Sequence, residues 1–438
     1  MSFKAAKQWL LNEGRRRGLE LEVLGSSQRQ LEIDAVDGKA ADFNLSTRGG
    51  VGVRVVVGGK VGYASTEDLA PEALAWTLDE AVENAELQPA GRAALPAGGA
   101  LGRHDLLDEG LSAELAAKAG AAVELHRGLA QDERVQSIQY ARYSEGQIDV
   151  ELGSTTGVDG SYRAGTAAVI AGLVMREGES VKQGFEYDAK GDFHQLEPGR
   201  TALRALDQIG RQLGARPLIT GRRRAIFEPQ VVGSLLQLLS YALSGKTLAE
   251  GKSALAGKLG ERIAAENVTL VDDATRHGGL ASRPFDAEGT PSQRLVVIEN
   301  GTFRSFLHNT DTAARTGQST TGHAKRDYRS TLGVAPTNLI LEPGSGISPG
   351  DGVLVTDLMG VHAGANPITG DVSVQAMGLE TANGETFPVD DFAVSFNLFE
   401  LLLRVEEVGA EVLERPAAGG GSVVVPSIAV ADVSFAGK

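Results

Sequence analysis

Histidines and cysteines are the residues that would most directly reveal metal chemistry, and this chain has few of them. Among its 438 residues there is no cysteine, and the seven histidines are His104, His126, His194, His277, His308, His323 and His362. No two histidines lie three to five residues apart, so no helix would present a histidine pair on one face, and HExxH is absent. We therefore expect no metal ligand and no metal-dependent catalytic residue in this chain.

Motifs for phosphate binding and for nucleophilic catalysis are also absent. The sequence has no P-loop, no GxSxG elbow between a strand and a helix, and no GxGxxG that opens a helix after a strand. The run Gly49-Gly50-Val51-Gly52 lies inside an alternating strand pattern. There it predicts a bulge or a close backbone crossing, not a phosphate site.

One polar loop of the second half, residues 283–294, carries candidate functional groups. They are Phe285, Asp286, Glu288, Gly289 and Gln293. The two carboxylates could form an acid/base pair or hold a cation. Alternatively, they accept backbone N–H groups in a turn that is shaped by two prolines and Gly289.

A second polar loop, residues 317–329, combines hydroxyl groups, glycines and cations. Its candidate residues are Ser319, Thr320, Gly322 and His323. It could bind an anion or a peptide carboxylate, or it is simply a solvated surface loop. The basic run at 222–224 has two similar interpretations, a solvated strand edge or a basic patch for acidic partners.

The elements that must position these loops follow from hydrophobic periodicity and turn residues. In the first half, strands are predicted at 20–24, 30–34, 51–57, 61–64, 135–142, 148–152, 166–175 and 180–187. Helices are predicted over 3–17, from Pro71 to about 86, from a Ser112 cap to about 130, and before 214 with Leu203, Leu206, Ile209 and Leu213 inward. In the second half, we predict a strand at 224–227, an apolar helix at 230–244, Asn-Gly hairpins at 300–301 and 383–384, a helix capped by Asn397 that runs through Val408, and strands over 423–435.

The predicted fold class is α+β, with an amino-terminal α+β half joined to a β-rich carboxyl-terminal half. The expected domains are 1–215 and 216–438, with a sub-division near 88–104, because residues 88–102 are rich in Pro, Ala and Gly. The order strand, turn, strand, helix occurs in 50–86 and again in 165–213. This could be a diverged internal repeat or a coincidence of α+β order.

Composition excludes several functional classes. The net charge of −15 argues against direct nucleic-acid binding, which needs a dominant basic surface. No uncharged apolar run is long enough to span a membrane, and no signal peptide is recognisable at the start. The absence of cysteine fits a reducing compartment, so we expect a cytoplasmic location.

Several long motifs are similar to those of the TldD/PmbA family, in order along essentially the whole chain. They are GVGVR at 50–54, GYAST at 62–66, PFDAEGTPSQR at 284–294, VIENG at 297–301, STTGHA at 319–324, TGDVS at 369–373, ETANGE at 380–385 and VPSI at 425–428. TldD-like members of this family carry the zinc motif HExxxH on a helix and a cysteine near the carboxyl end. Here the corresponding helix reads QLLSYA at 237–242, and PAAGGG at 416–421 has no cysteine. The resemblance is thus to the PmbA (TldE-like) branch.

This resemblance implies a non-catalytic subunit of a heterodimeric zinc metalloprotease that processes or degrades unfolded peptides. The zinc is expected in a TldD-like partner, and the chain is expected to be inactive alone. An extended peptide would lie in a chamber between the subunits, and the loops at 284–294 and 317–329 would line the peptide path or the subunit interface. Two alternatives stay open: a homodimeric peptide-binding or regulatory protein without a protease partner, and a self-sufficient hydrolase built from Asp286, Glu288 and His308 or His323.

Overall fold

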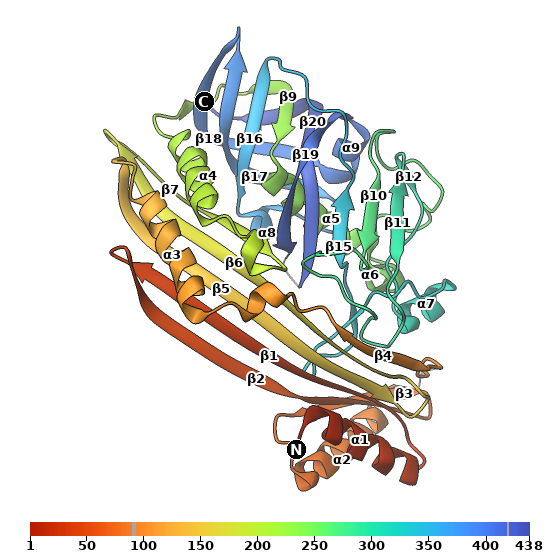
Figure 1. Cartoon of the computed structure of the whole chain (residues 1–438). Coiled ribbons are helices and arrows are strands. Elements are labelled where there is room, and N and C mark those ends of the chain that lie inside the picture. The colour runs from red at the N-terminus through yellow and green to blue at the C-terminus, as the bar shows by residue number, and fades with distance from the viewer. Residues whose placement is uncertain (90–92, 418–419) are drawn as a thin grey trace.

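The computed structural model describes residues 1–89, 93–417 and 420–438, and two large β-sheets make up most of it (Figure 1). The α+β fold class expected from the sequence is confirmed. The predicted linker at 88–102 falls partly on residues 90–92, and the stretch at 416–421 partly on residues 418–419, which lie outside the described residues.

The first sheet is built from long strands. Its members are β1 (Glu20–Val36), β2 (Lys39–Val57), β3 (Lys60–Thr66), β4 (Ala100–Asp105), β5 (Val135–Ser154), β6 (Asp159–Glu177) and β7 (Ser180–Lys190). They lie in the order β3-β2-β1-β5-β6-β4, with β7 also paired to β6. All pairs are antiparallel except the one between β4 and β6.

The sequence predicted two strands each in place of β1 and β5, whereas both are continuous in the structure. Instead of separate strands at 20–24 and 30–34, β1 is continuous, and the polar residues around Glu145 lie in the middle of β5. Glu145 reads as a turn residue, but its carboxylate is buried, paired with Lys118 at 2.5 Å and hydrogen-bonded by the Tyr143 hydroxyl. A buried charge with such partners can remain in a strand.

Helices cover the two ends of this sheet. The helices α1 (Phe3–Arg16) and α2 (Pro71–Glu86) gather at one end of the long strands, while α3 (Leu115–Leu129) and α4 (Pro198–Gly210) lie over the other end (Figure 1). Each end is built from the same order of elements: a helix, two long strands, a shorter strand and a second helix. The first set is α1-β1-β2-β3-α2, and the second is α3-β5-β6-β7-α4. Two details were wrong: Ser112 ends a short 3-10 helix and does not cap α3, and Leu203 is exposed because it lies on the outer face of α4.

The second sheet contains the strands of the other half. They are β8 (Arg216–Pro217), β9 (Gly221–Phe227), β10 (Leu270–Asp273), β11 (Arg294–Glu299), β12 (Thr302–Phe303), β15 (Asn338–Leu341), β16 (Gly352–Met359), β17 (Asp371–Ala382), β18 (Glu385–Asn397), β19 (Val405–Ala417) and β20 (Gly421–Ala436). Their order is β12-β11-β10-β15-β20-β9-β16-β17-β18-β8, with β19 paired to β20. Both predicted Asn-Gly hairpins are confirmed, with positive φ at the asparagine and glycine of each.

Two predictions for this half were wrong. The strand with the arginine run is not an edge, because β9 lies between β20 and β16, and its arginines pair with Asp432, Glu380 and Glu407. The helix that begins after Asn397 is only α9 (Leu398–Leu403), and β19 follows it directly. Its later apolar residues pack as a strand, because pairing with β20 offers them a place in the sheet.

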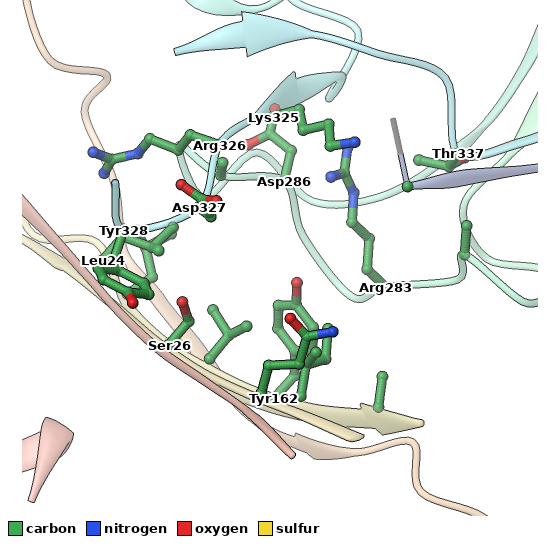
Figure 2. A pocket seen from close by; sticks show the side chains of 18 of the residues that line it. Leu24, Ser26, Tyr162, Arg283, Asp286, Lys325, Arg326, Asp327, Tyr328 and Thr337 are labelled. Atoms are coloured by element: carbon green, nitrogen blue, oxygen red, sulfur yellow. The ribbon is translucent and has the colours of Figure 1, made fainter. Parts of the chain in front are cut away.

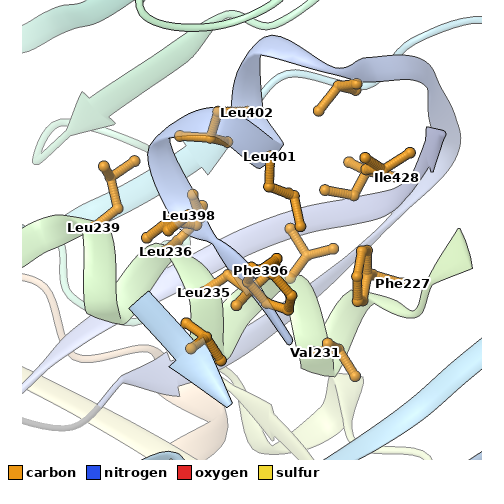
Figure 3. Packing of buried hydrophobic residues seen from close by; sticks show 14 of the residues in the cluster. Phe227, Val231, Leu235, Leu236, Leu239, Phe396, Leu398, Leu401, Leu402 and Ile428 are labelled. Atoms are coloured by element: carbon orange, nitrogen blue, oxygen red, sulfur yellow. The ribbon is translucent and has the colours of Figure 1, made fainter. Parts of the chain in front are cut away.

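The largest hydrophobic core lies beneath the apolar helix α5 (Pro229–Leu243). Leu235, Leu236 and Leu239 of α5 pack with residues of β18, α9 and β20 (Figure 3). Shorter elements complete this half: α6 (Gly245–Ala249), α7 (Thr310–Thr316), α8 (Val361–Gly364), β13 (Ala324–Lys325) and β14 (Gly333–Val334). No helix within the described ranges is long and apolar enough to cross a bilayer.

Candidate functional site

Asp286 is the anchor of the first polar loop. Its Oδ1 accepts the backbone N–H groups of Glu288 and Thr290, each at 2.9 Å, and its Oδ2 accepts that of Ala324 at 3.0 Å. The turn interpretation is thus confirmed for Asp286, which also ties this loop to the second one. Burial raises the pKa of Asp286, while Arg283 and the accepted N–H groups lower it; the balance lies above the ordinary value.

Glu288 belongs to a buried ionic chain that connects the two halves. Its carboxylate contacts Arg54 Nη1 at 2.8 Å and accepts the Thr310 N–H at 2.8 Å. Arg54 Nε lies 3.6 Å from Glu22, whose carboxylate also pairs with Arg326. Burial would lower the pKa of Arg54, but the carboxylates of Glu22 and Glu288 raise it above its ordinary value. The four ionic side chains therefore form one buried network between the two halves.

His323 lies in a second buried network. Its Nε2 contacts Asp272 Oδ1 at 3.0 Å, and its Nδ1 contacts Thr321 Oγ1 at 2.8 Å. The hydroxyl–imidazole–carboxylate order resembles that of a hydrolase triad. However, Thr321 Oγ1 is enclosed, because it also accepts the backbone N–H of His308 at 2.6 Å, and all these side chains are buried. A substrate carbonyl cannot reach this hydroxyl in the structure as it stands.

The remaining candidate residues support the same two loops. Phe285 packs edge-on against Tyr162, with 5.3 Å between ring centroids, and Gln293 donates to the Thr321 carbonyl at 3.3 Å. Gly289 and Gly322 have positive φ. Thr320 is half-buried, and Ser319 is exposed. The 321–324 segment is thus buried and not solvated.

The loops also explain the glycine run in β2. A Cβ atom at Gly52 would overlap the carbonyl oxygen of Tyr328, and one at Gly50 would overlap the Tyr328 ring. The predicted close backbone crossing is therefore confirmed, and it brings the second polar loop against the first sheet.

Three of the open spaces of the molecule lie beside these loops or beside α5. One pocket of about 410 Å³ is lined by Gln237, Ser240 and Tyr241 of α5, and an adjoining one of about 610 Å³ extends to β7 and shares Gln237 and Val423 with it. We call these two pockets the α5 groove. A third space of about 440 Å³ shares Pro336 with the groove and is lined by Arg283 and Lys325 (Figure 2). We call it the cationic cavity.

Sequence reasoning missed most of the groove. Seven consecutive residues of β7, from Val181 to Tyr187, line it, and Arg415 of β19 reaches across to Glu186 and to the Tyr187 carbonyl. Phe185 is exposed there, at 58% of its surface. The sequence contains no signal for this surface, because a strand pattern does not show which of its side chains are exposed.

Within residues 1–89, 93–417 and 420–438, no group of three or more His, Asp or Glu side chains is arranged to hold a metal ion. The α5 face toward the groove presents amide, hydroxyl and phenol groups, which are weak zinc ligands.

Comparisons with known proteins agree with this architecture. The PmbA/TldA metallopeptidase domain 1 is matched over residues 21–85, the central domain over 108–213 and the C-terminal domain over 220–437. An uncharacterised protein of Methanocaldococcus jannaschii is 29% identical over 96% of this chain and 97% of its own. Metalloprotease PmbA of Escherichia coli O157:H7 is 25% identical over 96% of this chain and 94% of its own.

Solved structures give the same result. A putative modulator of a DNA gyrase from Thermotoga maritima superposes with a TM-score of 0.87 at 25% identity, covering 99% of this chain and 100% of that one. TldE from Thermococcus kodakarensis has the same fold, with a TM-score of 0.87 at 24% identity over 98% of this chain and 100% of its own. The fold and these matches define a metallopeptidase-related protein. The chain belongs to the PmbA/TldD family.

Proposed function

We propose that this chain is the non-catalytic subunit of a heterodimeric TldD/TldE-type zinc metalloprotease, in which it forms part of the chamber wall and binds unfolded peptide. One observation carries the proposal: α5 lies beside the groove, but the positions that correspond to HExxxH are Gln237, Leu238 and Ala242. Zinc and the general base would then come from the TldD-like partner, and the complex would work in the cytoplasm.

The α5 groove offers a path for an extended peptide. Among the described strands β7 pairs only with β6, so its other edge offers N–H and C=O groups, apart from the Tyr187 carbonyl that Arg415 binds. Residues 181–187 of this strand line the groove. A peptide could add to this edge as a further strand. Main-chain hydrogen bonds would give affinity for many sequences, which suits a protease that acts on unfolded chains.

The two polar loops would act as supports of the wall. Asp286, Glu288 and His323 are committed to internal hydrogen bonds and ion pairs, so they would hold the groove in place without touching the peptide. The same commitment weighs against the self-sufficient hydrolase, because a nucleophile and its base must reach the substrate.

Co-expression with a TldD-like subunit from the same organism tests the proposal. Size determination should give a one-to-one complex, with zinc in the partner only, and peptide cleavage should require both chains. A control complex whose partner has both HExxxH histidines changed to alanine should assemble and not cleave. Stoichiometric zinc together with cleavage by the isolated chain would refute the proposal, and a stable homodimer that ignores the partner would favour the regulatory alternative.

A further inference from the structure

The cationic cavity contains two cations without a counter-ion. Arg283 and Lys325 come from the two polar loops and point toward each other over the open space (Figure 2). No described carboxylate lies within 4.0 Å of either cation, whereas most other arginines of the chain have such a partner. The segments outside the described residues, 90–92 and 418–419, contain no Asp or Glu.

Unused hydrogen-bond donors accompany these charges. Arg283 Nη2 donates to the Gly322 carbonyl at 3.2 Å, but its Nε is buried without a partner among the described residues. The Tyr162 hydroxyl, which also lines the cavity, makes no hydrogen bond to any described residue. Burial and the charge of Arg283 both lower the pKa of Lys325. Two like charges held together at a partly buried place are costly unless an anion joins them.

The carboxylates nearest to the cavity are already engaged. Asp286 accepts three backbone N–H groups, and Asp327 accepts those of Arg329 and Ser330. The charges of these two carboxylates reduce the free-energy cost of placing Arg283 and Lys325 close together, but neither carboxylate forms an ion pair with them. The cavity thus keeps an excess of positive charge in a chain whose net charge is −15.

The position of the cavity suggests which anion it takes. The α5 groove runs from β7 past Gln237 and meets the cavity at Pro336. A peptide that extends along the groove would therefore bring one end to Arg283 and Lys325. We propose that the cationic cavity binds the C-terminal carboxylate of the peptide, with Arg283, Lys325 and the Tyr162 hydroxyl as donors; this rests on the peptide-binding function proposed above.

This inference is tested by peptide binding to the complex of this chain with its TldD-like subunit. The TldD-like subunit is loaded with zinc, and the glutamate of its HExxxH is changed to glutamine so that the bound peptides are not cleaved. The probes are N-acetylated octapeptides of one sequence without acidic residues, ending in a free carboxylate or in an amide, and binding is measured by calorimetry. We expect the acid to bind about tenfold more tightly than the amide, as one charge-assisted contact accounts for that factor. Lys325→Met should remove this preference without changing the affinity for the amide, and Lys325→Arg should restore most of it.

Control measurements distinguish a failure of the carboxylate site from a failure of peptide binding as a whole. Arg304→Gln, an exposed arginine that pairs with Glu299 outside the cavity and outside both polar loops, should leave the preference unchanged. Equal binding of acid and amide would overturn the carboxylate site and leave peptide binding standing, whereas no binding of either would overturn both. Inorganic phosphate that binds in a Lys325-dependent manner, but does not compete with the acid peptide, would also overturn the assignment. Arg283→Gln, checked for folding by circular dichroism, should reproduce the effect of Lys325→Met.

Discussion

The buried ionic chain between the two halves allows a quantitative prediction for Arg54→Met. Arg54 is 4% exposed and lies between Glu22 and Glu288, which are 0% and 1% exposed. At a charge separation of about 4 Å and an effective dielectric constant of about 20, the attraction to Glu288 alone is about 4 kcal/mol. Methionine fills much of the space of the aliphatic stem, but it leaves Glu288 buried without a cation. We therefore expect a loss of about 3–5 kcal/mol in the free energy of unfolding.

Urea denaturation with two optical probes measures this loss. Both tryptophans, Trp9 and Trp76, lie in α1 and α2, so their fluorescence reports on the end of the first sheet that contains Arg54, while circular dichroism reports on the whole chain. Arg222→Met is the matched control, because it removes an ion pair whose side chains are 57% and 60% exposed, and such pairs contribute little. Its midpoint should stay close to that of the unchanged chain.

A double variant decides whether the unpaired charge is the cause. Glu288→Gln keeps an acceptor for the Thr310 N–H but removes the charge. Arg54→Met with Glu288→Gln should thus be more stable than Arg54→Met alone, by at least about 1 kcal/mol. If the double variant is less stable than the single one, or if Arg54→Met behaves like Arg222→Met, the buried charge does not govern the stability of this junction.

Three further perturbations have expected outcomes. Gly52→Ala should cost about 1–3 kcal/mol in urea denaturation, because its Cβ would overlap the Tyr328 carbonyl, while Gly146→Ala, with open space around it, should cost much less. Burial, and secondarily the charge of a neighbouring histidine, lowers the pKa of His308, so the unfolded chain takes up its proton first and stability should fall as pH drops below about 6.5; His308→Asn should flatten that slope in denaturation curves at several pH values. Phe185→Ser should weaken peptide binding by calorimetry about tenfold at unchanged thermal stability, since this ring is exposed in the groove.

The sequence predicted the parts of the fold that depend on neighbouring residues. The Asn-Gly hairpins and the helix that begins at Pro71 follow from local backbone preferences, and the structure confirms them. The long strands were divided because polar residues such as Glu145 resemble turn residues until their partners are known. Lys118, the partner of Glu145, belongs to a helix that packs on the face of the sheet. The hydrophobic periodicity of a strand does not show that such a partner exists.

The candidate site was predicted less well, for the same reason. The ion pair between Glu22 and Arg326 joins residues 304 positions apart, and Arg415 meets Tyr187 across 228 positions. Residue types in the two polar loops indicated charge and hydrogen-bonding capacity correctly, but not that the carboxylates turn inward while Arg283 and Lys325 line an open space. Which side of a loop faces the interior depends on the surface that it packs against.

The packing of α5 bears on the proposal that this chain contributes no zinc site of its own. At the position that corresponds to the second histidine of HExxxH, Ala242 is completely buried in the largest core, next to Leu239 and Leu243. An imidazole there would overfill a close-packed interior at a cost of about 1–3 kcal/mol, and its ring nitrogens would lose their water. Only Gln237 among the three positions lines the groove. In this chain α5 packs small and aliphatic side chains into the core and borders a groove, which is the arrangement that the proposed role requires of a subunit that holds the substrate while its partner supplies the zinc.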